Sequence, residues 1–355
     1  MSKTPPHDAE TTPARRKLPL VDEALPRPSG WFSLGLASAL ARGDVRPVRF
    51  FGEDLVLFRT EGGAVGLLDA HCPHLGAHFA HGGTVVGERL RCPFHGFCFD
   101  ADGACGATGY GTKVPPGLRA GAWSVVERHG LLLAWHDAQR RPPAWEVPDL
   151  DMEGWSPFVL HEWTLRGHPQ ETTENSVDIG HFGVVHGYED VRETRPVDID
   201  GPVLRTHYAF TRRVGGRRSP VTIREEIAVV VRGLGYSLVE VSDLGSGAQL
   251  RLLVLPTSED DDRLRLRIGL SVRDLARTEG ARPWLKLVPA AVTRRLVAPI
   301  VLRVYAGEVE QDFAVWRHKR YLPRPALAAG DGPIGPYRRW ARQFYASAGA
   351  TAASP

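Results

Sequence analysis

The sequence predicts an α+β protein, in which a small all-β domain precedes a larger domain whose antiparallel sheet grips a long helix. Between residues 31 and 135, short apolar runs are separated by the turn signals Gly43-Asp44, Glu61-Gly62-Gly63 and Asp102-Gly103, a pattern typical of a small antiparallel β domain. Longer alternating runs follow between residues 203 and 272, and an apolar stretch with helical character covers about residues 283–318.

The length of 355 residues suggests two domains. We expect the first to span residues 28–145 and the second residues 146–346, with Arg141-Pro142-Pro143 as the linker. Residues 1–27 are rich in Pro, Thr and charge, so we expect a disordered leader rather than a signal peptide, and residues 347–355 should form a disordered tail. No stretch reaches about 18 uninterrupted apolar residues, so no transmembrane helix is expected.

Five alternating runs predict strands of the second domain's sheet. They are Val203–Arg213, Thr222–Val231, Tyr236–Val241, Gln249–Leu255 and Leu264–Val272. The apolar residues within 284–305 fit a core helix, a lid over a hydrophobic pocket, or a face that contacts a membrane. Tyr337, Trp340 and Phe344 recur at helical spacing and predict a terminal helix.

Two short motifs in the first domain combine Cys and His: Cys72-Pro73-His74 and Cys92-Pro93-Phe94-His95. A Rieske [2Fe–2S] cluster needs this set, because one iron takes two Cys and the other takes two His. A Cys2His2 zinc site is the alternative, but zinc ligands usually follow C-x2–4-C and H-x3–5-H spacing. We therefore expect Cys72, His74, Cys92 and His95 to bind a [2Fe–2S] cluster.

The other Cys and His residues of this region are expected to have different roles. We predict that Cys98 and Cys105 are small core residues rather than ligands. His71, His78 and His81 are expected to be loop residues or hydrogen-bond donors near the cluster.

A second motif begins the larger domain, with Asp178, His181 and His186 in the run from residue 174 to 186. Two His and one carboxylate can hold a mononuclear non-haem iron with open coordination positions. His181 and His186 would lie about 140° apart on an ideal helix, so both reach one ion only if the helix ends or distorts between them. Gly183 is placed to allow this, and a π-type turn is another route.

The third iron ligand should be a carboxylate from elsewhere in the chain. Asp312 is the best candidate, with Glu308 and Glu310 as competitors. Asp178 would share a helix face with His181, and we expect its carboxylate to accept the free ring N–H of that histidine rather than bind iron.

These motifs match the Rieske non-haem iron oxygenase family in type, order and spacing, and the chain resembles that family over nearly its whole length. Two stretches are similar to the steroid and sterol branch, which includes cholesterol 7-desaturases and the oxygenase component of 3-ketosteroid 9α-hydroxylase. They are residues 68–78 and the C-terminal segment that begins at Val315-Trp316-Arg317-His318. One departure is Phe97, where many members have Trp.

The resemblance implies an all-β Rieske domain followed by a helix-grip catalytic domain of the START/Bet v1-like type. It implies that Asp178 bridges to a cluster-ligand His of a neighbouring subunit for electron transfer, that Asn175 lies beside the iron site, and that the protein forms a homotrimer. The implied reaction is hydroxylation or desaturation of a hydrophobic steroid-like substrate with O2, and the electrons come from NAD(P)H through a separate reductase or ferredoxin.

Composition and motifs limit the remaining function classes. The net charge of +3 gives no reason to expect nucleic-acid binding, although peripheral membrane contact stays open. Four Cys, two of them assigned to a cluster, predict a reducing, cytoplasmic setting. The run Gly330–Gly335 matches G-x-G-x-x-G but contains Pro333 and follows no buried strand, so we reject a dinucleotide site. An aromatic-ring hydroxylating oxygenase is the alternative function, and an electron carrier without oxygenase activity is a distant one.

Overall fold

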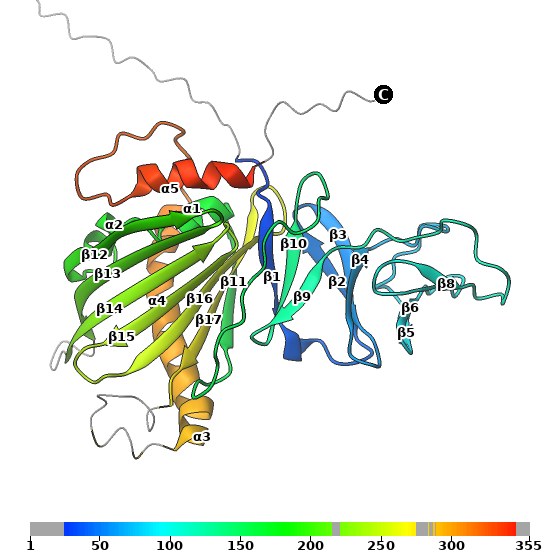
Figure 1. The fold of residues 1–355 in the computed structure, drawn as a ribbon, viewed down its shortest axis with the longest axis horizontal. Helices are drawn as coiled ribbons and strands as arrows, with labels where there is room; N and C mark the ends of the chain where they lie inside the picture. The colour runs from blue at the N-terminus through cyan, green and yellow to red at the C-terminus, as the bar shows by residue number, and fades with distance from the viewer. Residues whose placement is uncertain (1–24, 215–220, 275–282, 284–286, 288, 346–355) are drawn as a thin grey trace, which may run out of the picture.

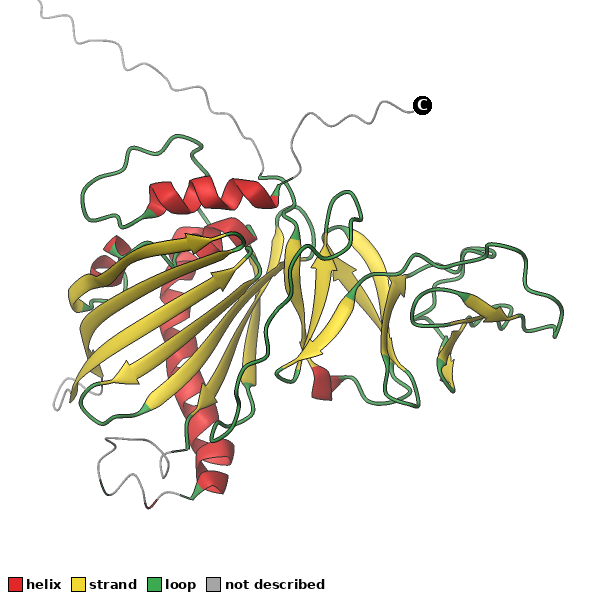
Figure 2. Cartoon of the chain, viewed as in Figure 1, coloured by secondary structure: helices red, strands yellow, loops and turns green. Residues whose placement is uncertain are grey.

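The computed structural model describes residues 25–214, 221–274, 283, 287 and 289–345. Along the chain, a β-rich first part is followed by a second part in which a large antiparallel sheet packs against a long helix (Figure 1 and Figure 2). The predicted fold class is therefore confirmed. The expected leader up to residue 24 and the expected tail lie outside the described residues.

Three small antiparallel sheets make up the first part. The first sheet consists of β1 (Gly30–Leu36), β10 (Leu131–His136) and β9 (Val125–Arg128), and the short 3-10 helix η1 (Ala37–Ala39) follows β1. The second sheet consists of β2 (Val45–Phe50), β3 (Glu53–Arg59) and β4 (Val65–Asp69). The third is β5 (Thr84–Val86), β6 (Arg89–Arg91), β7 (Cys98–Phe99) and β8 (Cys105–Ala107). Each predicted turn signal lies next to these strands, and the third sheet lies at the end of the molecule farthest from the second part (Figure 1).

The second part contains a seven-stranded antiparallel sheet in the order β11-β17-β16-β15-β14-β13-β12. Its central strands β13 (Val203–Val214), β14 (Val221–Arg232), β15 (Tyr236–Asp243), β16 (Gln249–Ser258) and β17 (Arg263–Val272) confirm the five predicted runs. The edge strands β11 (Val159–Arg166) and β12 (Glu189–Asp200) were not predicted. Almost every residue of β12 is exposed, so its sequence lacks the alternation of apolar and polar residues that predicts a strand. Its pairing with β13 also contains register shifts.

A long helical segment crosses one face of this sheet (Figure 1). It consists of α3 (Ala290–Val292), the π-helical turn η4 (Thr293–Val297) and α4 (Ala298–Trp316). Leu302 and Phe313 are buried against Leu264 and Ile268 of β17, as a core helix requires. The opposite side exposes apolar residues, because Leu296 and Ile300 are 58% and 62% exposed. Trp284, Leu285 and Val288 lie outside the described residues, and a lid or a membrane contact stays a prediction.

The C-terminal helix α5 (Ile334–Ala341) and the 3-10 turn η5 (Arg342–Phe344) close one end of the sheet. Tyr337, Trp340 and Phe344 are all buried, which confirms the predicted terminal helix. The Ser29 N–H donates to the Phe344 carbonyl (2.7 Å), so the beginning and the end of the described chain lie together.

The two parts share one apolar core. Trp31 and Leu133 of the first part pack in the same cluster as Tyr236 and Leu253 of the second. The Ser33 carbonyl also accepts hydrogen bonds from the Arg267 guanidinium (2.7 Å) and the Thr257 hydroxyl (2.9 Å). Within the described residues, no helix is long and apolar enough to span a membrane.

Candidate metal centres and substrate cavity

The two Cys loops of the first part have matching main-chain hydrogen bonds. The N–H of Cys72 donates to the Ala77 carbonyl and the N–H of Cys92 donates to the Phe97 carbonyl, both at 2.8 Å. Each loop turns at a glycine with positive φ, 75° at Gly76 and 67° at Gly96, a conformation that residues with a Cβ adopt only with strain. The sequence C-P-x-x-G thus forms the same turn twice.

The four predicted cluster residues come together as two pairs. Cys72 and Cys92 are buried and their thiols are close enough to hydrogen-bond, while the rings of His74 and His95 are half-buried with centroids 4.9 Å apart. These residues fit a [2Fe–2S] cluster, in which two Cys would bind one iron and two His the other. It does not fit zinc, because the ligand atoms of these four residues do not gather around one point as those of the second motif do.

The sulfur of Cys72 is buried and accepts main-chain hydrogen bonds. Burial raises the pKa of the Cys72 thiol to about 11, and the main-chain N–H groups of His74 and Leu75 lower it by hydrogen-bonding to the sulfur. Such N–H groups would tune the potential of a cluster bound at this sulfur.

The other Cys and His residues of this region lie beside the loops. Cys98 and Cys105 are half-buried thiols directed at the carbonyls of Gly96 and Ala107, at 3.4 and 3.5 Å. His71, His78 and His81 form a row in which His78 is central, with ring centroids 5.0 and 4.5 Å from its two neighbours.

The second motif lies in a segment of two short helices joined by a turn, next to α5 (Figure 1). Helix α1 (Pro169–Glu174) ends in a turn, and α2 (Gly180–Val184) follows. Helix α2 ends between His181 and His186, as two ligands of one ion require. Gly183 lies inside α2, next to its last residue Val184, and a turn at Val185 and His186 follows. Asp178 also precedes α2 rather than lying on a helix with His181.

The structure brings His181, His186 and Asp312 together. One potential ligand atom from each lies within 4.8 Å of the other two, and among the described residues this is the one group of three His, Cys, Asp or Glu side chains with that property. The His186 Nε2 lies 3.7 Å from Asp312 Oδ2, too long for a good hydrogen bond but suited to two ligands that share an ion. Burial raises the pKa of Asp312, and His186 and His181 offset part of that shift.

Hydrogen bonds at the far ring nitrogens orient both histidines. The Nδ1 of His181 is 2.5 Å from the Asp178 carbonyl oxygen, and the Nδ1 of His186 is 3.1 Å from Gln311 Oε1. Each oxygen can only accept, so each Nδ1 carries the proton and each Nε2 keeps a free lone pair. This is the tautomer that a metal-binding imidazole needs.

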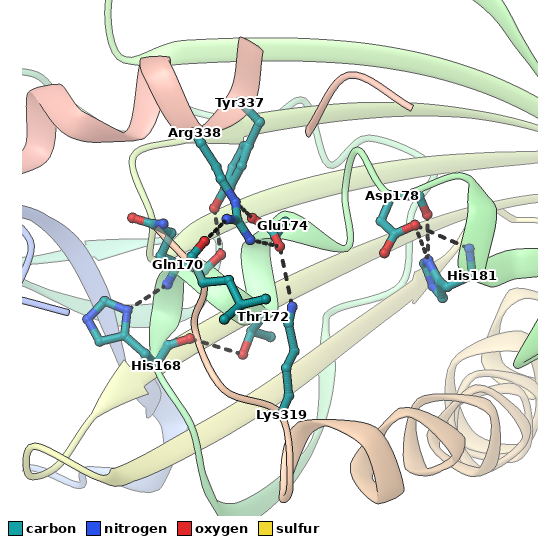
Figure 3. Close-up of polar contacts among 10 residues, drawn as sticks. His168, Gln170, Thr172, Glu174, Asp178, His181, Lys319, Tyr337 and Arg338 are labelled. Atoms are coloured by element: carbon teal, nitrogen blue, oxygen red, sulfur yellow. Dashed lines mark hydrogen bonds and ion pairs between the residues drawn. The ribbon is translucent and has the colours of Figure 1, made fainter. Parts of the chain in front are cut away.

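The hydrogen bond expected between the Asp178 carboxylate and the His181 ring is not formed. The carboxylate accepts the main-chain N–H of His181 (3.2 Å) and lies 3.6 Å from its Nδ1, while the Asp178 carbonyl takes the ring proton (Figure 3). Burial raises the pKa of Asp178, but the nearby ring and the main-chain N–H of His181 outweigh it and leave the pKa below its usual value. Among the described residues, the other carboxylate oxygen has no hydrogen-bond donor, so it is free to accept one.

The competing carboxylates have other partners. Glu308 accepts hydrogen bonds from the Tyr188 hydroxyl (3.0 Å) and the Arg212 guanidinium (2.6 Å), and Glu310 accepts one from Trp163 Nε1 (2.9 Å). Asn175 hydrogen-bonds to the Asp312 side chain and lowers its pKa. This geometry favours Asp312 as the third ligand and places Asn175 beside it.

A buried ion cluster that was not predicted fixes the segment in front of this site. The Glu174 carboxylate accepts from Nε (2.5 Å) and Nη2 (2.9 Å) of Arg338 on α5, and Lys319 Nζ lies 3.3 Å away (Figure 3). The Tyr337 hydroxyl donates to the Gln170 carbonyl (2.7 Å) in the same region. Glu174 directly precedes Asn175, so these contacts hold the turn that leads to His181.

A cavity of about 180 Å³ adjoins the three candidate ligands between the sheet and α4. Two alternate residues from each of β14, β15, β16 and β17 point into it, because side chains at i and i+2 share one face of a strand. These residues are Ile227, Val229, Val239, Val241, Leu252, Val254, Leu266 and Ile268. The cavity wall opposite the ligands is therefore apolar.

Comparison with known proteins agrees with this architecture. The 3-ketosteroid 9alpha-hydroxylase C-terminal domain matches residues 134–345, and the Rieske [2Fe-2S] domain matches residues 30–116. The chain is 30% identical to cholesterol 7-desaturase of Bombyx mori over 331 residues, which cover 90% of this chain and 70% of that protein. It is 31% identical to a probable 3-ketosteroid-9-alpha-monooxygenase, oxygenase component, of Rhodococcus rhodochrous over 346 residues, which cover 89% of this chain and 79% of that protein.

Solved structures share the fold. A variant of Pseudomonas putida CBB5 NdmA with theobromine has a TM-score of 0.67 and 18% identity, and the match covers 88% of this chain and 89% of that one. Both family domains occur here in sequence order, so the chain has the cluster domain and the catalytic domain of an oxidoreductase rather than an electron carrier's alone. The chain belongs to the Rieske non-haem iron oxygenases, in the group that contains 3-ketosteroid 9α-hydroxylases and cholesterol 7-desaturases.

Proposed function

We propose that this chain is the terminal oxygenase of a multicomponent system that hydroxylates or desaturates a steroid or sterol with O2 and externally supplied electrons. The observation that carries the proposal is the position of His181, His186 and Asp312 at the wall of an apolar cavity. A hydrophobic substrate held there would present a C–H bond to a metal bound by these residues.

The residues divide the chemistry between two sites. A [2Fe–2S] cluster held by Cys72, His74, Cys92 and His95 would supply single electrons. An iron held by His181, His186 and Asp312 would supply the activation of O2 at its open positions. Asp178 and Gln311 hold the two imidazoles in the metal-binding tautomer, and the apolar wall of the cavity keeps water away from the reacting bond.

A homotrimer would bring the two sites together. The Cys loops and the second motif lie in opposite parts of one chain, with the shared core between them (Figure 1). Leu75 and Phe94, next to the cluster histidines, are 64% and 63% exposed, as expected of a surface that a second copy covers. In that arrangement the free oxygen of Asp178 would accept a hydrogen bond from a cluster histidine of the neighbouring subunit.

The substrate class follows from the cavity and the relatives together. The relatives' names specify cholesterol and a 3-ketosteroid, and the paired apolar residues of β14–β17 suit a rigid fused-ring hydrocarbon. A separate reductase or ferredoxin would deliver electrons from NAD(P)H in a cytoplasmic setting.

Single-turnover product analysis tests this function. The full chain is loaded with both metal centres, reduced, and exposed to O2 with cholesterol, a 3-ketosteroid or naphthalene. We expect an oxidised or desaturated steroid and no naphthalene diol. A naphthalene diol without any steroid product would instead support the aromatic-ring hydroxylating alternative.

A further inference from the structure

Tyr305 and Glu308 line the cavity next to the candidate iron ligands. They belong to a buried polar cluster that also contains Arg212 and Glu225. Arg212 of β13 forms a two-point ion pair with Glu225 of β14, with Nε 2.8 Å from Oε2 and Nη2 2.9 Å from Oε1. The other terminal nitrogen of Arg212 donates to Glu308 of α4 (2.6 Å), which also accepts from the Tyr188 hydroxyl (3.0 Å). Tyr305, one turn before Glu308, accepts a hydrogen bond from Arg212 Nη2 (3.4 Å).

This cluster is unusual because burying charge is expensive. Arg212 and Glu225 are 7% and 4% exposed, and replacing such groups by apolar ones of similar size is often neutral or stabilising. Two carboxylates also face one guanidinium, so the cluster has no charge balance of its own. A role in recognition would explain why these charged groups lie beside a cavity whose β14–β17 wall is apolar.

The hydroxyl proton of Tyr305 has no acceptor among the described residues. Tyr188 donates its hydroxyl proton to Glu308, and Arg212 directs its N–H groups at Glu225, Glu308 and Tyr305. Tyr305 accepts from Arg212, and no described group accepts from Tyr305. Burial and the negative charge of Glu225 raise its pKa well above the usual value, so the hydroxyl stays protonated.

The position of Tyr305 on α4 fixes its distance from the candidate iron ligand Asp312. Tyr305, Glu308 and Asp312 all line the cavity, and they fall on one face of α4 at helical spacing. Asp312 comes seven positions after Tyr305, which is about 10 Å along the helix axis. Val309 lies between them on the cavity wall.

We propose that the Tyr305 hydroxyl, held by Arg212, donates a hydrogen bond to a carbonyl oxygen at one end of the substrate and so fixes which carbon faces the iron. This inference rests on the proposed function and adds to it the residue that binds the substrate's oxygen, at the end remote from the attacked carbon. The apolar residues of β14–β17 contact the body of the substrate, and the Tyr305 hydroxyl binds its polar end.

Ligand binding to wild type and Tyr305→Phe tests the proposal. The full chain with both metal centres is titrated with androst-4-en-3-one, which has one oxygen, and with androst-4-ene, which has none, both delivered from the same cyclodextrin solution. A lost neutral hydrogen bond should weaken binding of the ketone by about three- to tenfold relative to the hydrocarbon. The hydrocarbon should bind both proteins equally well, because Phe keeps the ring.

Tyr208→Phe is the matched control. The Tyr208 hydroxyl also belongs to a cavity residue, but it donates to the Ser176 carbonyl (2.6 Å), so its loss should leave the ratio of ketone to hydrocarbon affinity unchanged. As a second readout, single turnover of the ketone should give one product position with wild type and a mixture with Tyr305→Phe. The recovery of the cluster's EPR signal checks that the variant folds.

The outcomes separate the two claims. If wild type binds both steroids and the affinity ratio is the same in Tyr305→Phe, the anchor is wrong while the proposed function stands. If wild type binds neither steroid, the steroid-oxygenase function is wrong and the anchor is wrong with it. A ratio that changes as much in Tyr208→Phe as in Tyr305→Phe would also overturn the anchor.

Discussion

The Glu174–Arg338 ion pair allows a prediction that can be worked out from the structure. The two side chains are 5% and 12% exposed and make two hydrogen bonds, so they are buried partners. Arg338→Met removes one partner and leaves a buried carboxylate, which typically costs about 3–5 kcal/mol. Lys319 remains 3.3 Å from Glu174 and offsets part of the loss, so we expect the lower end, about 3 kcal/mol.

Urea denaturation of the full chain measures this cost, from the shift of the midpoint at unchanged m-value. The double variant Glu174→Gln with Arg338→Met should regain most of the stability, because the buried carboxylate of Glu174 is removed together with its partner. Arg128→Met is the control: its partner Asp149 is 85% exposed at 3.5 Å, so it should cost less than about 1 kcal/mol.

The same variant should weaken the mononuclear iron site. Glu174 holds the turn that carries Asn175 toward Asp312, so Arg338→Met should lower iron occupancy at that site and leave the cluster intact. If Arg338→Met costs no more than Arg128→Met, or if the double variant is as unstable as the single one, the ion pair does not hold this segment.

Three further predictions concern the candidate metal sites and pH. Asp178→Asn should keep both metal centres, since an amide oxygen can still accept the His181 N–H, yet should slow product formation by a large factor in steady-state assays; full activity would contradict the electron-transfer role. Asp312→Ala should lose the mononuclear iron, whereas Glu310→Gln should keep it, as metal analysis of the purified proteins would show. Burial lowers the pKa of His168 to about 4, so between about pH 6.5 and 4 the unfolded state binds a proton that the folded state does not. The free energy of unfolding should therefore decrease by up to roughly 3 kcal/mol as the pH falls through this range. His168→Gln should flatten that part of the stability–pH curve; an unchanged slope would assign the pH dependence to other groups.

Much of the fold could be predicted from the sequence because its signals are local. The alternation in β13–β17 and the spacing of Tyr337, Trp340 and Phe344 report directly which side chains are buried. Edge strand β12 gave no such signal, because most of its side chains face solvent. Helix α1 is also short, and its burial depends on contacts with α5 that the local sequence does not contain.

The site was predictable where residue type and spacing carry the chemistry. His181 and His186 could be chosen from their motif, whereas Asp312 could be preferred but not separated from Glu308, which lies one helical turn away. The position of Asp178 was harder, because a main-chain carbonyl rather than its side chain takes the His181 proton. Glu174 and Arg338 are 164 positions apart, and the sequence around each of them contains no pattern that predicts the pair.

Counting iron in the purified protein and its ligand variants tests the central claim most directly. With two separate centres, wild type should contain about three iron atoms and two inorganic sulfides per chain and show a Rieske-type EPR signal after anaerobic reduction. His186→Ala should lose one iron and keep the EPR signal, while Cys92→Ser should lose the signal and the sulfide but keep the iron held by His181 and Asp312. If His186→Ala retained all its iron, or wild type contained zinc and no sulfide, the two-centre account would be wrong.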